Sequence, residues 1–237
     1  MRTEKIPLEW GTKKNVRWRV PLPDRGNSSP IVWGEKVFIT QATDSDNRRT
    51  VMCFDKRTGE LLWRTGVTYT KAEKTHKTNP YCSGSPATDG RVVVANYASA
   101  GVAAYDLDGQ QLWHRKLGPQ DHIWGNGTSP VLFGDLCIIY HGPGPHSSLL
   151  GLDKLTGRTV WTRKVEEKDD PDRVDGFRGQ NGGINGAFTT PIVIEANDRA
   201  GDVFGESVVG RGLAVADLEG DGAVSYTHLT LPTNREV

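Results

Sequence analysis

Short runs of alternating apolar and polar residues recur along most of the chain, separated by clusters of Gly, Pro, Asp and Ser. Alternation with a period of two is typical of a half-buried strand, and such clusters are typical of tight turns. In one early stretch the pattern predicts four strands, at 30–33, 36–40, 50–54 and 60–64. We therefore expect an all-β protein.

Two linked motifs each occur three times. The first is SPIVWGE at 29–35, SPATDG at 85–90 and SPVLFGD at 129–135, and its Gly always follows its Ser by five positions. The second is DKRTGELLW at 55–63, DLDGQQLW at 106–113 and DKLTGRTVW at 153–161. The Trp residues that end the second motif lie 50 and 48 residues apart. Such a period indicates a repeat architecture in which each unit packs against its neighbours.

Each repeat is interpreted as one propeller blade, because a small sheet cannot bury both faces alone and needs flanking sheets. Gly34 and Gly59 allow the positive φ of hairpin turns, and Asp55 is expected to cap the turn that it opens. The Trp that ends each repeat, Trp63, Trp113 and Trp161, is expected to fill the wedge between neighbouring blades.

The predicted fold class is all-β, a partial β-propeller of four-stranded antiparallel blades. Full blades are expected at 28–66, 84–117 and 128–165, with a partial blade at 184–197 and an isolated outer strand at 15–20. Closed propellers usually have four to eight blades, so a shorter row leaves open edges. We therefore expect a fragment that is cut short at both ends.

The two motifs together resemble the PQQ-like repeat that quinoprotein alcohol dehydrogenases share with the outer-membrane barrel-assembly lipoprotein. The resemblance covers roughly 10–197, and the repeat domain is placed at 1–197. It implies a periplasmic or secreted protein, although 1–10 contain no apolar segment of the kind found in a signal peptide.

The C-terminal part of the chain departs from the repeat. The segment 198–223 never reaches a second motif, and it is interpreted either as a sequence junction or as the start of a calcium loop. Asp217, Glu219 and Asp221 would supply the calcium ligands, because alternate carboxylates followed by Gly can surround a hard cation. The segment 224–237 resembles translated sequencing adapter, so a non-native tail is expected there.

Composition excludes several classes of protein. The 29 basic and 29 acidic residues cancel and form no basic stripe, which argues against a nucleic-acid partner. No apolar run is long enough to span a membrane. Cys53, Cys82 and Cys137 are scattered, without the spacing of a zinc site or a disulfide framework.

The candidate chemistry is sparse. Quinoprotein dehydrogenases hold PQQ with a Trp platform, calcium, a catalytic Asp and often a vicinal Cys pair, and this chain has no such pair. No hydrolase, nucleotide-binding or metalloprotease motif occurs. We therefore expect no cofactor and no catalytic residue, with PQQ and calcium left as alternatives.

The connections before the second and third blades should lie on one rim, where partners commonly bind. They contain His76, Tyr81, His122 and Trp124, which are predicted to form a binding surface. The predicted function is that of a non-catalytic exported scaffold that binds a protein or an extracellular ligand through its rim loops. Two alternatives stay open, a fragment of a PQQ-dependent oxidoreductase and a scaffold for outer-membrane protein assembly.

Overall fold

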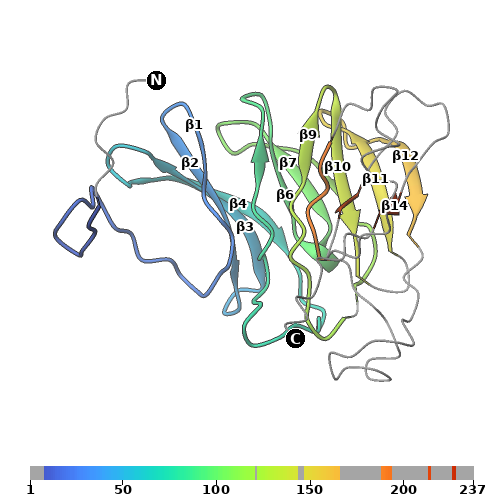
Figure 1. The fold of residues 1–237 in the computed structure, drawn as a ribbon, viewed down its shortest axis with the longest axis horizontal. Helices are drawn as coiled ribbons and strands as arrows, with labels where there is room; N and C mark the ends of the chain where they lie inside the picture. Colours follow the sequence, from blue (N-terminus) through green and yellow to red (C-terminus); the bar gives the residue numbers. More distant parts are fainter. Residues whose placement is uncertain are drawn as a thin grey trace, which may run out of the picture.

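Three sheets stand side by side in the computed structural model, in the order in which they occur along the chain (Figure 1). The structure describes residues 8–120, 122–143, 147–165 and 188–193, together with the backbone of two short strands nearer the C-terminus. Within these residues each of the three sheets has four antiparallel strands that follow one another in sequence. The predicted all-β fold and its blades are confirmed.

Each sheet lies at one of the predicted repeats, although β4 runs two residues past the predicted end of the first blade at 66. The first blade contains β1 (Ile31–Trp33), β2 (Lys36–Thr43), β3 (Arg48–Asp55) and β4 (Leu61–Thr68). The second contains β5 (Ala87–Thr88), β6 (Val93–Asn96), β7 (Val102–Tyr105) and β8 (Gln111–Arg115), with a 3-10 helix, η1 (Ala98–Ala100), between β6 and β7. The third contains β9 (Val131–Phe133), β10 (Leu136–His141), β11 (Ser148–Asp153) and β12 (Thr159–Lys164).

Two further strands pair outside the three blades. They are β13 (Leu213–Ala214) and β14 (Tyr226–Thr227), and they run antiparallel. The second of them lies in the tail at 224–237, whose predicted non-native origin stays a prediction.

The first blade is longer than its sequence pattern indicates. β2 and β3 continue to a turn at 44–47, where Asn47 has a φ of 53°. Asn tolerates this left-handed conformation better than most residues, so the hairpin extends past the last strongly apolar position.

The second motif forms the turn between the third and fourth strands of a blade. In the first blade, Asp55 Oδ1 accepts hydrogen bonds from the backbone N–H of Arg57 and of Thr58, each at 2.8 Å. Gly59 follows with a φ of 74°. The carboxylate therefore caps the turn as predicted, and these hydrogen bonds hold the pKa of Asp55 below its ordinary value.

The Trp that ends one blade packs against this turn in the next blade. Trp63 Nε1 donates to the carbonyl oxygen of Leu107 at 3.1 Å, and Trp113 Nε1 donates to that of Lys154 at 2.9 Å. The indoles lie over the turn glycines, where a Cβ on Gly109 or Gly157 would come within 2.7 or 2.6 Å of an indole carbon. The predicted filling of the wedge is confirmed for both Trp residues.

Trp161, the third predicted wedge residue, lies on β12. It packs over Gly151 of its own blade and beside a buried cluster that includes Ile138 and Tyr140.

A second contact between blades is a series of hydrogen bonds between the segments that open successive blades. The backbone N–H of Ser29 donates to Ser85 Oγ at 2.9 Å, and that of Ser85 donates to Ser129 Oγ at 2.9 Å. The backbone N–H of Ser129 donates in turn to Thr190 Oγ1 at 3.1 Å. We call this series the hydroxyl ladder. The last bond brings in 188–193, which lie within the predicted partial fourth blade at 184–197; that blade stays a prediction.

The prediction of a strand at 15–20 is wrong. These residues belong to no sheet, because the described part of the chain offers no strand of their own blade to pair with. The segment is held instead through Trp18, whose Nε1 donates to the carbonyl oxygen of Lys56 at 2.8 Å over Gly59. Trp18 therefore occupies the wedge position of a blade that would precede the first.

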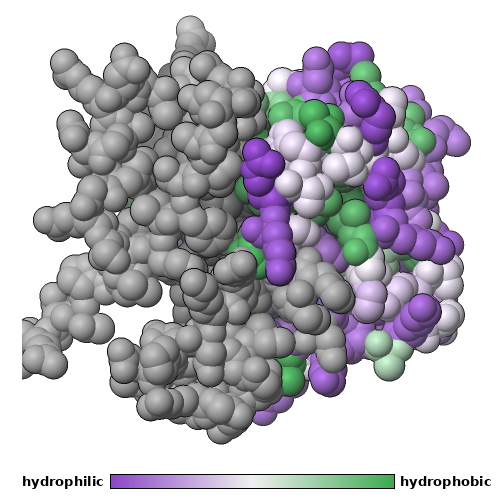
Figure 2. Space-filling view, turned by 90° about the vertical axis from the view of Figure 1, so that its right-hand side faces the viewer, coloured by the Kyte–Doolittle hydropathy of each residue, from purple (hydrophilic) through white to green (hydrophobic). Residues whose placement is uncertain are grey.

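The largest cores lie between blades. One joins the first and second blades around Phe38 and Tyr105, and another joins the second and third around Val94 and Ile139. These four side chains are fully buried. On the face seen from the β12 end, the described residues mix hydrophobic and hydrophilic side chains (Figure 2).

Candidate functional site

Two long connections between blades lie at the same rim, at the lower edge of Figure 1. They are 69–86, between β4 and β5, and 116–130, between β8 and β9. Asn79 Nδ2 donates to the carbonyl oxygens of Trp124 at 2.5 Å and Asn126 at 3.3 Å. A Cβ on Gly125 would lie 2.5 Å from Thr75 Oγ1, so Gly125 packs closely against the Thr75 side chain. The connections thus form one surface, which we call the rim surface.

His76 and Trp124 meet on the rim surface. Their ring centroids lie 4.4 Å apart with an angle of 47° between the planes, and both side chains are half-buried. The structure therefore brings together two of the four predicted rim residues. Their role in binding stays a prediction.

Tyr81 lies deeper between the first two blades. Its hydroxyl donates to the carbonyl oxygen of Glu73 at 2.6 Å, and the guanidinium of Arg49 lies 4.0 Å from its ring centroid. Arg49 is only 4% exposed, and its Nε has no hydrogen-bond partner among the described residues. Tyr81 is half-buried, like His76 and Trp124, and its contacts tie the connection to the first blade.

His122 packs inward as well. It is 5% exposed, and its ring meets that of Phe188 nearly edge-on at 5.2 Å between centroids. It therefore anchors the second connection against the partial fourth blade.

Asn79, Arg49 and Glu73 were not predicted from the sequence. Nothing in their local sequence marks them, since Arg49 follows another Arg in β3 and Asn79 lies in a polar loop. Their roles arise from contacts between segments that are distant along the chain.

The first connection presents positive charge. Lys71, Lys74 and Lys77 are exposed, whereas Glu73, its one acidic residue, points inward and accepts a hydrogen bond from the Ser99 N–H at 3.0 Å. Burial raises the pKa of Glu73 above its ordinary value, and the bond from Ser99 opposes that shift in part. The described exposed charges of this connection are therefore positive.

Glu73→Gln is expected to change how stability depends on pH. A carboxyl with a raised folded-state pKa contributes stability that is complete below its unfolded pKa and is lost as pH rises through the folded pKa. Gln keeps an oxygen for Ser99 but carries no charge, so the variant should gain in urea midpoint relative to wild type between the ordinary pKa of 4.5 and neutrality. A constant difference across that range would contradict the expectation.

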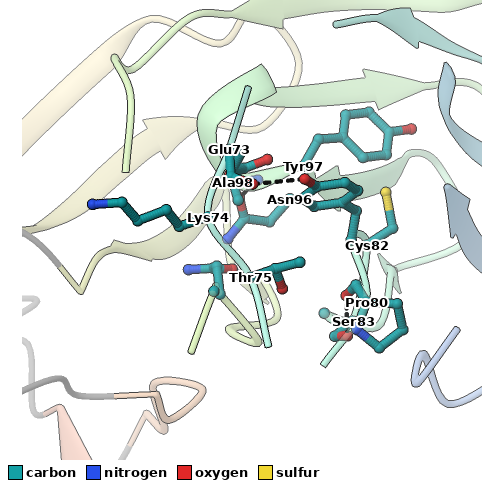
Figure 3. A pocket seen from close by; sticks show the side chains of 13 residues that line it. Glu73, Lys74, Thr75, Pro80, Cys82, Ser83, Asn96, Tyr97 and Ala98 are labelled. Carbon is teal, nitrogen blue, oxygen red and sulfur yellow. Dashed lines mark hydrogen bonds between the residues drawn. The ribbon is translucent and has the colours of Figure 1, made fainter. Parts of the chain in front are cut away.

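A small cavity lies beneath the rim surface (Figure 3). Its volume is about 10 Å³, and its lining includes Glu73, Cys82, Ala98 and Asn126. Cys82 and Ala98 both have positive φ, at 58° and 54°. The space is about the size of one water molecule. The cavity is therefore too small to hold an organic ligand.

The thiols of Cys53, Cys82 and Cys137 are buried in the cores between blades. Burial raises the pKa of Cys53 to about 11 and that of Cys82 to about 12, and it raises the pKa of Cys137 further. Because the thiolate is the nucleophile, we expect no alkylation of native protein by iodoacetamide at pH ~8 and alkylation of all three residues in urea. Rapid labelling of the native protein, measured by mass spectrometry, would contradict the burial of these thiols.

The repeat region of this chain matches a known protein family. The family described as outer membrane protein assembly factor BamB, built on PQQ-like repeats, matches residues 10–177. The chain belongs to this PQQ-like β-propeller family. Its three blades and the position of Trp18 fall within the matched range. No curated protein matches the chain significantly.

Several solved PQQ-like propellers are similar at low identity. BamB from Moraxella catarrhalis is 16% identical, with 62% of this chain and 41% of that one covered and a TM-score of 0.44. Quinohemoprotein alcohol dehydrogenase ADHIIG from Pseudomonas putida HK5 is 17% identical, with 67% and 24% covered and a TM-score of 0.47. A europium-containing methanol dehydrogenase is 15% identical, with 64% and 27% covered and a TM-score of 0.46. The chain thus spans less than half the length of each.

The four inner segments offer no cationic partner for the quinone that gives the repeat its name. PQQ carries carboxylates, which call for cationic partners, whereas the inner segments 29–33, 85–89, 129–133 and 188–193 contain no Lys or Arg. Three of their hydroxyl oxygens, those of Ser85, Ser129 and Thr190, accept the hydrogen bonds of the hydroxyl ladder.

The described residues contain neither a metal cluster nor a membrane-spanning helix. No group of three or more His, Cys, Asp or Glu side chains lies close enough together there to hold a metal ion. No helix among them is long and apolar enough to cross a membrane. The predicted calcium ligands, Asp217, Glu219 and Asp221, lie outside the described residues.

Proposed function

We propose that the chain is part of an exported, non-catalytic propeller scaffold that binds a protein through the rim surface. The observation that carries this proposal is the His76–Trp124 contact on two connections that hold each other in place. A preorganised aromatic pair loses little conformational freedom on binding, and Trp is among the residues that contribute most to interfaces.

The charge around the pair indicates the chemistry of the partner. Lys71 and Lys77 are exposed on the same connection as His76, and Arg25 donates to the Lys77 carbonyl oxygen of that connection at 3.1 Å. A segment with an apolar or aromatic side chain flanked by acidic residues complements this arrangement. The family description favours outer-membrane protein assembly as the process in which such a partner takes part.

The proposal is tested by capture from a periplasmic extract on immobilised protein, with quantitative mass spectrometry. Trp124→Ala and Lys77→Glu should each reduce the capture of one shared set of proteins at least about tenfold. Trp10→Ala is the matched control, because Trp10 is 63% exposed and lies outside the rim surface.

Raising the salt concentration should release the same proteins, since exposed charge pairs are screened. Equal capture by wild type, both rim variants and the control would overturn the proposal.

A further inference from the structure

Both connections of the rim surface contain a tight turn that begins with a histidine. In the first connection, the backbone N–H of Asn79 donates to the carbonyl oxygen of His76 at 2.8 Å. In the second, the backbone N–H of Gly125 donates to the carbonyl oxygen of His122 at 2.8 Å. The turns at 76–79 and 122–125 therefore contain both rings of the aromatic pair, His76 and Trp124.

In each turn the imidazole accepts a hydrogen bond from the backbone two residues further on. His76 Nδ1 accepts from the N–H of Thr78 at 3.3 Å, and His122 Nδ1 accepts from the N–H of Trp124 at 3.2 Å. A backbone N–H can only donate, so Nδ1 carries no proton in either turn. Each imidazole is thus neutral, with its proton on Nε2.

The two turns differ in what a proton on Nδ1 would meet. Thr78 Oγ1 lies 2.7 Å from His76 Nδ1, and a hydroxyl can accept, so a protonated His76 keeps a hydrogen-bond partner. In the second turn Trp124 takes the place of Thr78, and an indole N–H offers no acceptor. His122 is also only 5% exposed, whereas His76 is half-buried, so a charge on His122 is poorly solvated. Protonation therefore disrupts the second turn more than the first.

Trp124 depends on the second turn for its place on the rim surface. Its carbonyl oxygen accepts from Asn79 Nδ2 at 2.5 Å, and its ring meets that of His76 at 4.4 Å between centroids. The ring of His122 is itself packed against that of Phe188, at 5.2 Å between centroids. A fixed imidazole thus fixes the Trp124 backbone, and with it two of the contacts between the connections.

The titratable groups around the turns are mostly basic. They come from the first connection, from the segment before β1 and from β10, and they are Lys74, Lys77, Arg25 and His141. Glu73, the acidic residue of the first connection, accepts from the Ser99 N–H instead. Asp121, which precedes His122 in the sequence, is not among the described residues. The basic groups oppose a further positive charge on the second turn.

We propose that His122 is the positioning residue of the rim surface, and that the surface opens when this imidazole takes up a proton. The assembled turn binds one proton fewer than the open turn, so falling pH favours the open turn, by at most about tenfold per pH unit. Histidine is the side chain that ordinarily changes charge between about pH 5 and pH 8. The consequence, release of a bound protein in mild acid, rests on the proposed function.

Fluorine NMR of the full chain labelled with 5-fluorotryptophan tests the proposal without a partner. The Trp124 signal is assigned by its absence from Trp124→Phe. Between about pH 8 and about pH 5 this signal should shift or broaden as the turn opens. The signal of Trp113, which is 7% exposed in the core between the second and third blades, should stay in place and so verify that the blades remain folded.

His122→Asn keeps the acceptor and removes the titration. Asn Oδ1 is separated from Cα by the same number of bonds as His Nδ1, and Asn commonly accepts from the N–H two residues further on. The variant should therefore keep the neutral-pH signal of Trp124 down to pH ~5. His122→Ala lacks the acceptor and should show the open-turn signal at every pH. If His122 served only to fill space, the two variants would behave alike.

His76→Asn is the matched control, because it makes the same replacement in the first turn. Its Trp124 signal should start at a different position, since the aromatic contact is lost, but it should still respond to pH. A response that persists in His122→Asn and disappears in His76→Asn would overturn the proposal. A wild-type Trp124 signal that stays constant over the whole range would do the same. Neither result bears on capture at neutral pH, which tests the proposed function separately.

Discussion

Gly157→Ala is expected to lower the free energy of unfolding by about 3 kcal/mol, from a single added methyl group. Gly157 has a φ of 70°, and this left-handed conformation costs an L-residue about 1 kcal/mol. Its new Cβ would also lie 2.6 Å from an indole carbon of Trp113, and overpacking of this kind costs about 1–3 kcal/mol. Urea unfolding followed by circular dichroism measures the loss.

Gly134→Ala separates the two contributions. Gly134 has a φ of 53°, but its Cβ would meet nothing within 4 Å. It should lose only the backbone cost, about 1 kcal/mol. Equal losses in the two variants would show that the approach of the indole to the turn does not constrain this position.

Trp113→Ala is expected to lower the free energy of unfolding by about 4 kcal/mol. The side chain is 7% exposed, fills the core between the second and third blades, and donates its indole N–H to the Lys154 carbonyl oxygen at 2.9 Å. Its removal leaves both a cavity and a carbonyl oxygen without its donor. Urea unfolding measures the loss, and Trp10→Ala, at a position 63% exposed, should be close to neutral.

The loss of stability in Trp113→Ala should be confined to the contact between the second and third blades. Cys137 lies in the same core as Trp113, whereas Cys53 lies in the core between the first and second blades. Iodoacetamide should therefore label Cys137 of the Trp113→Ala variant well before Cys53. In the double variant with Gly157→Ala, the added methyl should cost only the backbone contribution of about 1 kcal/mol, since the indole it meets is gone. Simultaneous labelling and additive losses would argue against a discrete contact between these two blades.

The sequence was sufficient to predict the repeat and the blades because their determinants are local. Alternation located the strands, Gly34 and Gly59 marked turns that need positive φ, and Asp55 lay where a carboxylate can cap the turn. Trp63 and Trp113 were placed correctly since a large side chain at a fixed place in a repeat must face a neighbouring repeat.

The rest could not be predicted because it depends on contacts between distant segments. Apolar alternation at 15–20 indicated a strand, but a strand needs a partner, and the structure holds this segment by one indole instead. His122 and Trp124 are two residues apart in one loop, yet one is buried and the other lies at the rim. Loop composition alone does not distinguish such positions.

Adjacent blades each supply one half of the Trp contact, and this affects how such proteins can lengthen during evolution. A blade contributes an indole from its last strand to the next blade and offers a turn glycine to the previous one, as Trp63 and Gly109 illustrate. A duplicated gene segment that encodes one blade therefore brings both halves of the contact with it. The array can lengthen by copying a unit of about fifty residues, without a new interface having to evolve.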